Sequence, residues 1–311
     1  MSGPIGVLVM AYGGPDSLDE VEPYLLDVRG HRPTPTHIVE EIKGRYARIG
    51  GRSPILGKTR AQASALQNAL VNGGSGRFAT AVGMRHWQPR VGEALTALRD
   101  QGIDRVVALV MAPHYSSLSI DLYFAKVDEH RSTLEVAPIR EWHLLPGLLE
   151  ALADRIRTAL QLFPEQQRAR VPLLFTAHSL PRRILEAGDP YPAQLAETMR
   201  AVLDRLGDGR QREHRFAYQS AGRTGEPWLG PTAEAAVDVL AAEGHDTVLI
   251  VPIGFTCEHV EVLYDVDIEL REHARQRGVR LERIEMVNDH PAMISGLAET
   301  VRDAARARGW L

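Results

Sequence analysis

The chain has 311 residues, of which 44% are hydrophobic and 24% charged, with a formal net charge of −4. These values are typical of a soluble globular protein with room for two domains, and the charge argues against a general nucleic-acid binder. No run of about 18 apolar residues occurs, so no integral membrane segment is expected. The N-terminus lacks the basic region of a secretory signal. The single cysteine, Cys257, excludes an internal disulfide and indicates a cytoplasmic protein.

Strand-like and helical patterns alternate along the whole chain. Apolar runs predict strands at Gly6–Ala11, Arg77–Gly83, Arg105–Ala112, Val136–Trp142, Pro172–Ala177, Arg215–Gln219, Thr247–Pro252 and Leu281–Ile284. Helices are predicted at Ser17–Val28, His37–Ile49, Ile55–Val71, Arg90–Asp100, Asp121–His130, Leu148–Leu162, Ala193–Leu206, Thr232–Ala242, His259–Gln276 and Pro291–Arg308. The spacing of Ser17 and Glu20 is that of a capping box, which predicts that Ser17 caps the first helix.

This alternation predicts an α/β fold with parallel sheets that are covered by helices on both faces. We expect two such domains, residues 1–146 and residues 147–290, with the ligand site between them. The sequence leaves open whether the C-terminal helix, at about 291–311, packs back on the first domain.

Polar turns follow four of the apolar strands, in the sequences AYGGP, APHYSS, TAHSLP and PIGFTCEH. Open parallel sheets bind ligands outside the carboxyl ends of their strands. We therefore expect Tyr12, His114, Tyr115 and His178 to face common ground with the helix that carries Glu261. The first turn lacks GxGxxG, and the chain has no P-loop, GxSxG or HExxH motif, which argues against dinucleotide, nucleotide, serine-hydrolase and zinc-protease sites.

Three carboxylates, Glu261, Asp265 and Glu269, recur every four residues on the predicted helix, with His259 and Asp267 nearby. Residues at this spacing lie on roughly one helix face, where like charges repel each other. Carboxylate and imidazole groups together suit divalent metals, so a cation is the natural partner of this row. The alternative interpretation is a solvated acidic helix face.

A basic patch lies between the first two predicted strands. It contains Arg29, His31, Arg32, Lys43, Arg45, Arg48 and Arg52. Guanidinium groups recognise carboxylates and phosphates, and Tyr46, Ser53 and Tyr123 could add an apolar wall and polar contacts. The combination predicts a flat aromatic ligand with acidic arms, although a solvated basic face remains the alternative.

Taken together, the motifs resemble those of the ferrochelatase family, and within it the soluble bacterial coproporphyrin ferrochelatases. The resemblance covers nearly the whole chain. It rests on MAYGGP (10–15), RYARIGGRSP (45–54), APHYSS (112–117), TAHSLP (176–181), DPYP (189–192), YQSAG (218–222), PWLGP (227–231) and PIGFTCEHVEVLYDVDIE (252–269). It implies two Rossmann-like, chelatase-like domains with the active-site cleft between them. It also implies a lyase of heme biosynthesis that inserts Fe²⁺ into a porphyrin, namely coproporphyrin III to give coproheme.

The resemblance also implies roles for individual residues. His178 and Glu261 correspond to the catalytic pair that faces the pyrroles, and with Asp265 and Glu269 they correspond to the metal-binding row, on a helix that the family often widens into a π-turn. The residues that correspond to the substrate-binding positions are Tyr12, Arg29, Arg45, Tyr46, Ser53 and Tyr123. Tyr12 is expected opposite His178, across the macrocycle. Trp228 and the other tryptophans are interpreted as packing residues.

No permanent cofactor and no iron–sulfur cluster are expected, since one cysteine cannot hold a cluster. Fe²⁺ enters as a substrate. The implied pathway predicts transient handover to a coproheme decarboxylase, and we expect a monomer. Three alternatives remain: a protoporphyrin IX ferrochelatase, a chelatase that inserts another divalent metal into a different tetrapyrrole, and a non-catalytic porphyrin or metal carrier. The presence of Tyr12 favours the coproporphyrin enzyme over the protoporphyrin enzyme.

Overall fold

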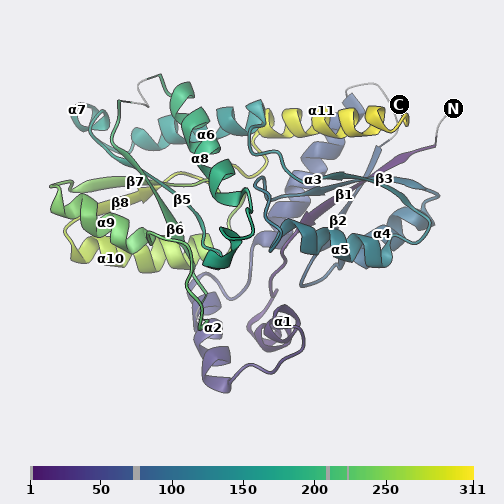
Figure 1. The fold of residues 1–311 in the computed structure, drawn as a ribbon, viewed down its shortest axis with the longest axis horizontal. Helices are drawn as coiled ribbons and strands as arrows, with labels where there is room; N and C mark the ends of the chain where they lie inside the picture. The colour runs from purple at the N-terminus through teal and green to yellow at the C-terminus, as the bar shows by residue number, and fades with distance from the viewer. Residues whose placement is uncertain (1–2, 73–77, 208–210, 223) are drawn as a thin grey trace.

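The computed structural model describes residues 3–72, 78–207, 211–222 and 224–311. Two four-stranded parallel sheets lie next to each other, in the orders β2-β1-β3-β4 and β6-β5-β7-β8 (Figure 1). The second sheet therefore repeats the strand order of the first. The strands are β1 (Ile5–Ala11), β2 (Phe78–Met84), β3 (Arg105–Val110), β4 (Glu135–Ile139), β5 (Leu173–His178), β6 (His214–Gln219), β7 (Thr247–Pro252) and β8 (Arg280–Arg283). The predicted fold class is confirmed.

Helices cover both faces of each sheet. They are α1 (Val21–Val28), α2 (Thr36–Arg48), α3 (Ile55–Asn72), α4 (Val91–Asp100), α5 (Ile120–His130), α6 (Pro146–Leu160), α7 (Glu165–Arg168), α8 (Tyr191–Arg205), α9 (Ala233–Ala242), α10 (Arg271–Gln276) and α11 (Pro291–Ala307). Two short 3₁₀ helices, η1 (Leu18–Glu20) and η2 (Arg182–Ile184), and a π-helix, η3 (Glu261–Leu270), complete the fold.

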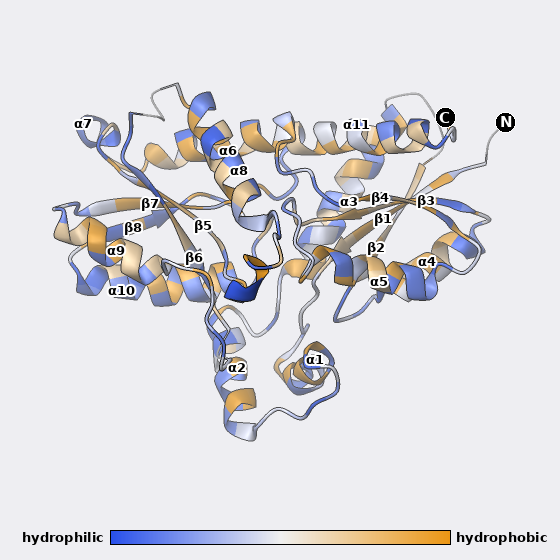
Figure 2. Cartoon of the chain, viewed as in Figure 1, coloured by the Kyte–Doolittle hydropathy of each residue, from blue (hydrophilic) through white to orange (hydrophobic). Residues whose placement is uncertain are grey.

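Strand β1 shows why the strands read as continuous apolar runs. All seven of its residues are buried, because β2 and β3 flank it and helices cover both faces. Its side chains alternate between the two faces. Val7 and Val9 join the apolar cluster that includes α3, whereas Leu8 and Met10 join the cluster of α4 and α5. Figure 2 shows the resulting apolar strands and the mixed polar and apolar helices around them.

One apolar cluster continues from the first sheet to the second. It contains Val9 of β1, Trp142, Phe175 of β5 and Leu297 of α11. Helix α11 packs on α6, on α3 and on β4, and Figure 1 shows it running above the first sheet. The chain thus returns to the N-terminal half, and a shared core holds the two sheets in one arrangement.

Most predicted elements are present with ends shifted by one to three residues. The largest strand difference is at β4, which stops at Ile139, because the chain then turns and the Trp142 amide donates to the Pro113 carbonyl at 2.9 Å. Two short helices, α7 and η2, were not predicted. The predicted start of β2 at Arg77 lies outside the described residues.

The predicted capping box at the first helix is wrong. The Ser17 side chain makes no capping hydrogen bond, and the helical segment after it begins with the 3₁₀ turn η1 rather than directly with an α-helix. The Glu20 carboxylate instead accepts from the Asp16 amide at 2.7 Å and from the Trp87 indole at 3.2 Å. This tertiary contact with Trp87 takes the carboxylate that the box required.

The predicted helix 259–276 is divided into the π-helix η3 and the short α-helix α10. π-Helical segments are rare, and they occur frequently at functional sites. Because η3 begins directly with Glu261, the wider helix starts at the acidic row that the sequence had singled out.

Candidate active site

A histidine–carboxylate pair lies where the second sheet meets the π-helix. His178 is the last residue of β5 and Glu261 is the first residue of η3. The His178 Nδ1 atom lies 2.9 Å from the Glu261 Oε2 atom, and each side chain is 31% exposed. The pair is therefore preformed and still reachable from solvent.

Each member of the pair favours the charged form of the other. Burial by itself lowers the pKa of His178, but the Glu261 carboxylate outweighs it, and the pKa of His178 is raised. Burial likewise pushes the pKa of Glu261 upward, yet His178 and then His259 hold it well below its usual range. Glu261 thus stays ionised, and His178 is a stronger base than an isolated imidazole.

A second imidazole lies near the same carboxylate oxygen of Glu261. The Nδ1–H group of His259 donates to the Cys257 carbonyl at 3.1 Å, and its Nε2 atom lies 3.9 Å from Glu261 Oε2. A carbonyl oxygen only accepts, so the proton on Nδ1 is fixed by this contact. Glu261 consequently lies between two histidines.

Gln219, at the end of β6, holds the start of the π-helix against β5. Its side-chain oxygen accepts from the Thr176 hydroxyl at 2.8 Å, and its amide nitrogen donates to the Glu261 carbonyl at 3.1 Å. Gln219 is 5% exposed, so both bonds form in a buried environment. The sequence analysis did not assign a role to this residue, although it lies in the YQSAG motif.

Asp265 lies four residues after Glu261 on η3. Its partners Ser220 and Arg45 both lower its pKa. Burial raises the pKa of Asp265 to about 6, the hydrogen bond from Ser220 opposes this rise, and the charges of Glu261 and Arg45 act in opposite directions. The Arg45 Nη1 atom lies 3.4 Å from the Asp265 carboxylate. Asp265 therefore changes charge close to neutral pH.

Glu269 is the exposed end of the acidic row. It borders a small depression of about 290 Å³ together with Arg48, Glu272 and His273. Among the residues that the structure describes, no three His, Cys, Asp or Glu side chains converge on one point as a ready metal cage. The carboxylates form a row along the helix instead.

Tyr12 follows β1 and belongs to the first sheet. Its ring lies 4.6 Å from the His86 ring and 5.7 Å from the Arg85 guanidinium. Burial of the phenol raises its pKa to about 12, and the charge of Glu261 adds to the rise. Ala11, at the end of β1, shares an apolar cluster with Cys257, so the turn after β1 lies near the turn that precedes η3.

Tyr46 and Tyr123 are both buried, and the charge of Glu261 contributes, after burial, to the raised pKa of each. The Arg85 guanidinium lies 5.5 Å from the Tyr123 ring as well as next to Tyr12, and Arg85 was not among the predicted residues. The rings of Tyr12 and Tyr123 thus lie beside the same arginine.

Three of the predicted binding residues have no described contact with His178 or Glu261 in this structure. The Ser53 hydroxyl accepts from the Ile55 amide at 3.4 Å and its own amide donates to the Pro15 carbonyl, so it supports the turn before α3. Arg45 donates to Glu41 at 3.0 Å and faces Asp265, with its guanidinium 5.1 Å from the Tyr264 ring. Arg29 is exposed after α1, and no described contact joins its side chain to the pair.

Trp228 was interpreted as a packing residue, and the structure places its ring against His178. Its ring meets His178 edge-on, with centroids 6.2 Å apart and planes at 89°. Its indole nitrogen donates to the Thr224 hydroxyl at 2.7 Å, which fixes the ring. The PWLGP motif, which contains Trp228, was the signal that could have identified it.

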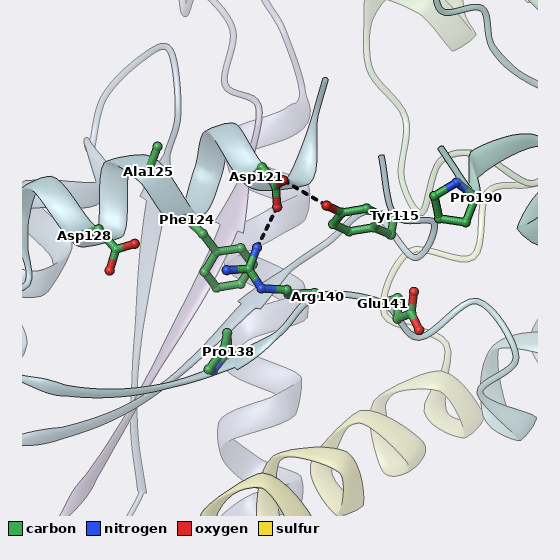
Figure 3. A pocket seen from close by; sticks show the side chains of 9 residues that line it. All are labelled: Tyr115, Asp121, Phe124, Ala125, Asp128, Pro138, Arg140, Glu141 and Pro190. Atoms are coloured by element: carbon green, nitrogen blue, oxygen red, sulfur yellow. Dashed lines mark hydrogen bonds and ion pairs between the residues drawn. The ribbon is translucent and has the colours of Figure 1, made fainter. Parts of the chain in front are cut away.

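An open depression of about 820 Å³ lies away from this pair, between α5, β4 and the start of α8 (Figure 3). Two of its charged groups already pair with each other, since Asp121 accepts from Arg140 at 2.7 Å, and Asp121 also accepts from the Tyr115 hydroxyl at 2.8 Å. None of the acidic-row residues lines it. The histidine–carboxylate pair, not the depression, is therefore the candidate site.

Comparison with known proteins assigns the family. The ferrochelatase family model matches residues 4–305. A ferrochelatase of Herpetosiphon aurantiacus is 41% identical over 97% of this chain and 99% of its own length. A ferrochelatase of Deinococcus radiodurans is 42% identical over 97% and 96%, and a coproporphyrin III ferrochelatase of Geobacillus kaustophilus is 37% identical over 95% and 94%.

Among solved structures, SirB from Bacillus subtilis with Fe³⁺ aligns with a TM-score of 0.56 at 11% identity, over 99% of this chain and 98% of that one. At this identity the likeness supports the fold alone. Within the described residues, no helix is both long and apolar enough to cross a bilayer. The family match and the sequence identities show that the chain belongs to the ferrochelatase family, the metal chelatases that insert iron into porphyrin.

Proposed function

We propose that this enzyme inserts Fe²⁺ into coproporphyrin III to give coproheme, with His178 and Glu261 as its catalytic pair. The observation that carries the proposal is the 2.9 Å contact between these side chains at the junction of β5 and η3. The relative from Geobacillus kaustophilus, named a coproporphyrin III ferrochelatase, supports the choice of substrate. The four acidic arms of that porphyrin also suit the basic residues beside the site.

Metal insertion requires removal of two pyrrole protons, and His178 is suited to this task. In its neutral form the Nδ1–H group donates to Glu261, so Nε2 is the basic nitrogen. Nε2 takes the two pyrrole protons one after the other and releases each to solvent, to which the side chain is 31% exposed, and the Glu261 carboxylate stabilises the imidazolium that forms each time. Glu261 keeps its charge because its pKa lies well below neutral pH.

The acidic row is suited to guide the other reactant, Fe²⁺, to the base. Glu269 is exposed, Asp265 has a side chain that is 16% exposed, and Glu261 touches His178, so the three carboxylates form a row along η3 that ends at the base. Hard oxygen ligands exchange with water on a divalent ion, which allows Fe²⁺ to lose its hydration shell in steps. We place the path of the incoming iron along this face of η3.

The first half supplies an aromatic face. Tyr12, which is 38% exposed, offers a polarisable surface against which a flat macrocycle can pack, whereas Tyr46 and Tyr123 are buried. Arg85 lies half-buried between the rings of Tyr12 and Tyr123, where a propionate arm can reach a guanidinium. Binding energy from the arms then holds the ring in place while its nitrogens face His178.

The substrate choice is tested by steady-state insertion of Fe²⁺ under anaerobic conditions, with coproporphyrin III and protoporphyrin IX in parallel. We expect kcat/KM to be at least about tenfold higher for coproporphyrin III, because two additional carboxylates each add a charge-assisted contact. An equal or reversed preference would assign the enzyme to protoporphyrin IX and leave the basic patch without its proposed role.

Replacing Arg45 by alanine should weaken iron uptake at neutral pH. Arg45 lowers the pKa of Asp265, which burial holds at about 6, so its removal raises that pKa further and protonates more of the carboxyl at pH 7. We expect the KM for Fe²⁺ to increase about threefold to tenfold at pH 7 and to recover by about pH 8. The KM for porphyrin should change less.

Arg48→Ala is the matched control, since the Arg48 guanidinium also lies over the Tyr264 ring, at 5.4 Å, and has no bond to Asp265 among the described contacts. A rise in the KM for porphyrin that is specific to Arg45→Ala, with the iron KM unchanged, would instead make Arg45 a ligand of the propionate arms.

A further inference from the structure

Two sequence motifs that play no part in this chemistry meet between the two sheets. The APHYSS segment follows β3 and the DPYP segment precedes α8. One carboxylate oxygen, Oδ2 of Asp189, accepts from the Ser116 hydroxyl at 3.0 Å, the Ser117 hydroxyl at 2.9 Å and the Ser117 amide at 2.8 Å. A single aspartate of the second half is thus tied by three hydrogen bonds to a turn of the first half.

Asp189 is also linked, through Tyr191, to the strand that carries His178. Its other oxygen, Oδ1, accepts from the Tyr191 amide at 3.1 Å and so fixes the first turn of α8. The Tyr191 side chain is 6% exposed, and its hydroxyl donates to the backbone carbonyl of His178 at 3.0 Å. The contacts therefore run without a break from Ser117 through Asp189 and Tyr191 to the histidine.

The Tyr191 hydroxyl is suited to a fixed donor role. Burial above all, with a contribution from the charge of Glu261, raises the pKa of Tyr191, so the phenol keeps its proton. Its ring also packs edge-on against His114 of the APHYSS segment, with centroids 6.3 Å apart. Both the ring and the hydroxyl of Tyr191 thus connect the first half of the molecule to the end of β5.

The position of His178 relative to the first half matters for the reaction. On one side the strand end is held by β6, since the Ser179 amide donates to the Gln219 carbonyl at 2.8 Å. Tyr191 supplies a second contact, and it alone of the two leads to the half that carries Tyr12. A small displacement of a base from its reacting atom has a large effect on rate, because the productive geometry is narrow.

We propose that Asp189 and Tyr191 are positioning residues that set the location of His178 relative to the aromatic half of the site. The inference rests on the proposed role of His178 as the base. The contacts of Asp189 bring the two halves together, and the Tyr191 hydroxyl transmits that placement to the backbone that carries the imidazole.

The test is Tyr191→Phe in the full chain, which removes only the hydroxyl. We expect kcat for anaerobic Fe²⁺ insertion to fall about fivefold to tenfold, because one hydrogen bond to a buried carbonyl is lost. The KM for porphyrin should stay within about twofold, since none of the contacts described for Tyr191 involves the proposed binding residues. Asp189→Asn should lower kcat in the same way.

Tyr115→Phe is the matched control. Its hydroxyl lies in the same region between the halves and donates to Asp121 at 2.8 Å, with no described bond to His178 (Figure 3). We expect kcat of this variant to stay within about twofold of wild type. The double variant Asp189→Asn/Tyr191→Phe should be no slower than the slower single variant, because both changes act through the same bond.

The proposal is overturned if Tyr191→Phe keeps wild-type kcat, if Tyr115→Phe loses as much, or if the losses of the double variant multiply. His178→Ala, measured alongside, distinguishes the positioning role of Tyr191 from the role of His178 as the base. If His178→Ala inserts iron at a near wild-type rate, the proposed role of His178 as the base fails, and the positioning role fails with it. If His178→Ala is inactive and Tyr191→Phe is fully active, only the positioning role fails.

Discussion

Replacing His178 by alanine is expected to reduce the rate of iron insertion about 10²- to 10⁴-fold, the range by which a positioned base accelerates proton transfer. The 2.9 Å contact with Glu261 makes His178 the base with the raised pKa at the site, and alanine removes it without adding bulk. Porphyrin affinity should stay within about threefold, because the aromatic side remains. Anaerobic insertion assays and porphyrin fluorescence titrations measure the two quantities separately.

His273→Ala is the matched control, since this histidine also pairs with a carboxylate, Asp238 at 2.8 Å, but lies on α10 outside the pair. It should insert iron at a rate within about twofold of wild type. Added imidazole should partly restore His178→Ala by supplying the missing base. Near-normal insertion by His178→Ala without imidazole would remove this residue from the mechanism.

Glu261→Gln is expected to lower kcat by at least about 10²-fold and to change its pH dependence. Glu261 raises the pKa of His178 against the opposing effect of burial, so glutamine leaves burial dominant and the pKa of His178 falls. Neutral His178 is the active base, and activity in the wild type is therefore lost as pH falls through the raised pKa. In the variant this loss of activity should move to lower pH.

The pH dependence of kcat from about pH 5.5 to 8.5 tests this point, with Glu261→Asp as the conservative variant that keeps the charge. If kcat of Glu261→Gln falls but its apparent pKa does not change, Glu261 does not act by shifting the pKa of His178. Glu261 would then be a metal ligand only.

The α/β fold could be predicted from the sequence because helices cover both faces of each sheet, so that central strands such as β1 and β7 are apolar along nearly their whole length. The same logic placed His178 and the Glu261 helix near each other, since carboxyl ends of parallel strands share one edge of a sheet. The π-helical form of η3 could not be derived from spacing, because carboxylates every four residues lie on roughly one face of either helix type. Only the resemblance to the family suggested it.

Partners from distant segments could not be predicted. Arg45 stands beside Asp265 because α2 packs against η3, a contact between residues 220 positions apart. The lost capping box has the same origin, since Glu20 bonds Trp87 from a later turn. Gln219, Trp228 and Tyr191 contact the pair through side chains whose types do not by themselves indicate this chemistry. The motifs marked their positions, but only the fold reveals what they touch.

The most direct test of the central claim is a single-turnover reaction of the purified wild-type chain with stoichiometric Fe²⁺ and coproporphyrin III under anaerobic conditions, followed by absorbance and by the mass of the product. We predict that coproheme forms at a rate at least about 10²-fold above that of His178→Ala at the same porphyrin occupancy. Tight binding of the porphyrin with no metal inserted would contradict the account and would make the protein a carrier.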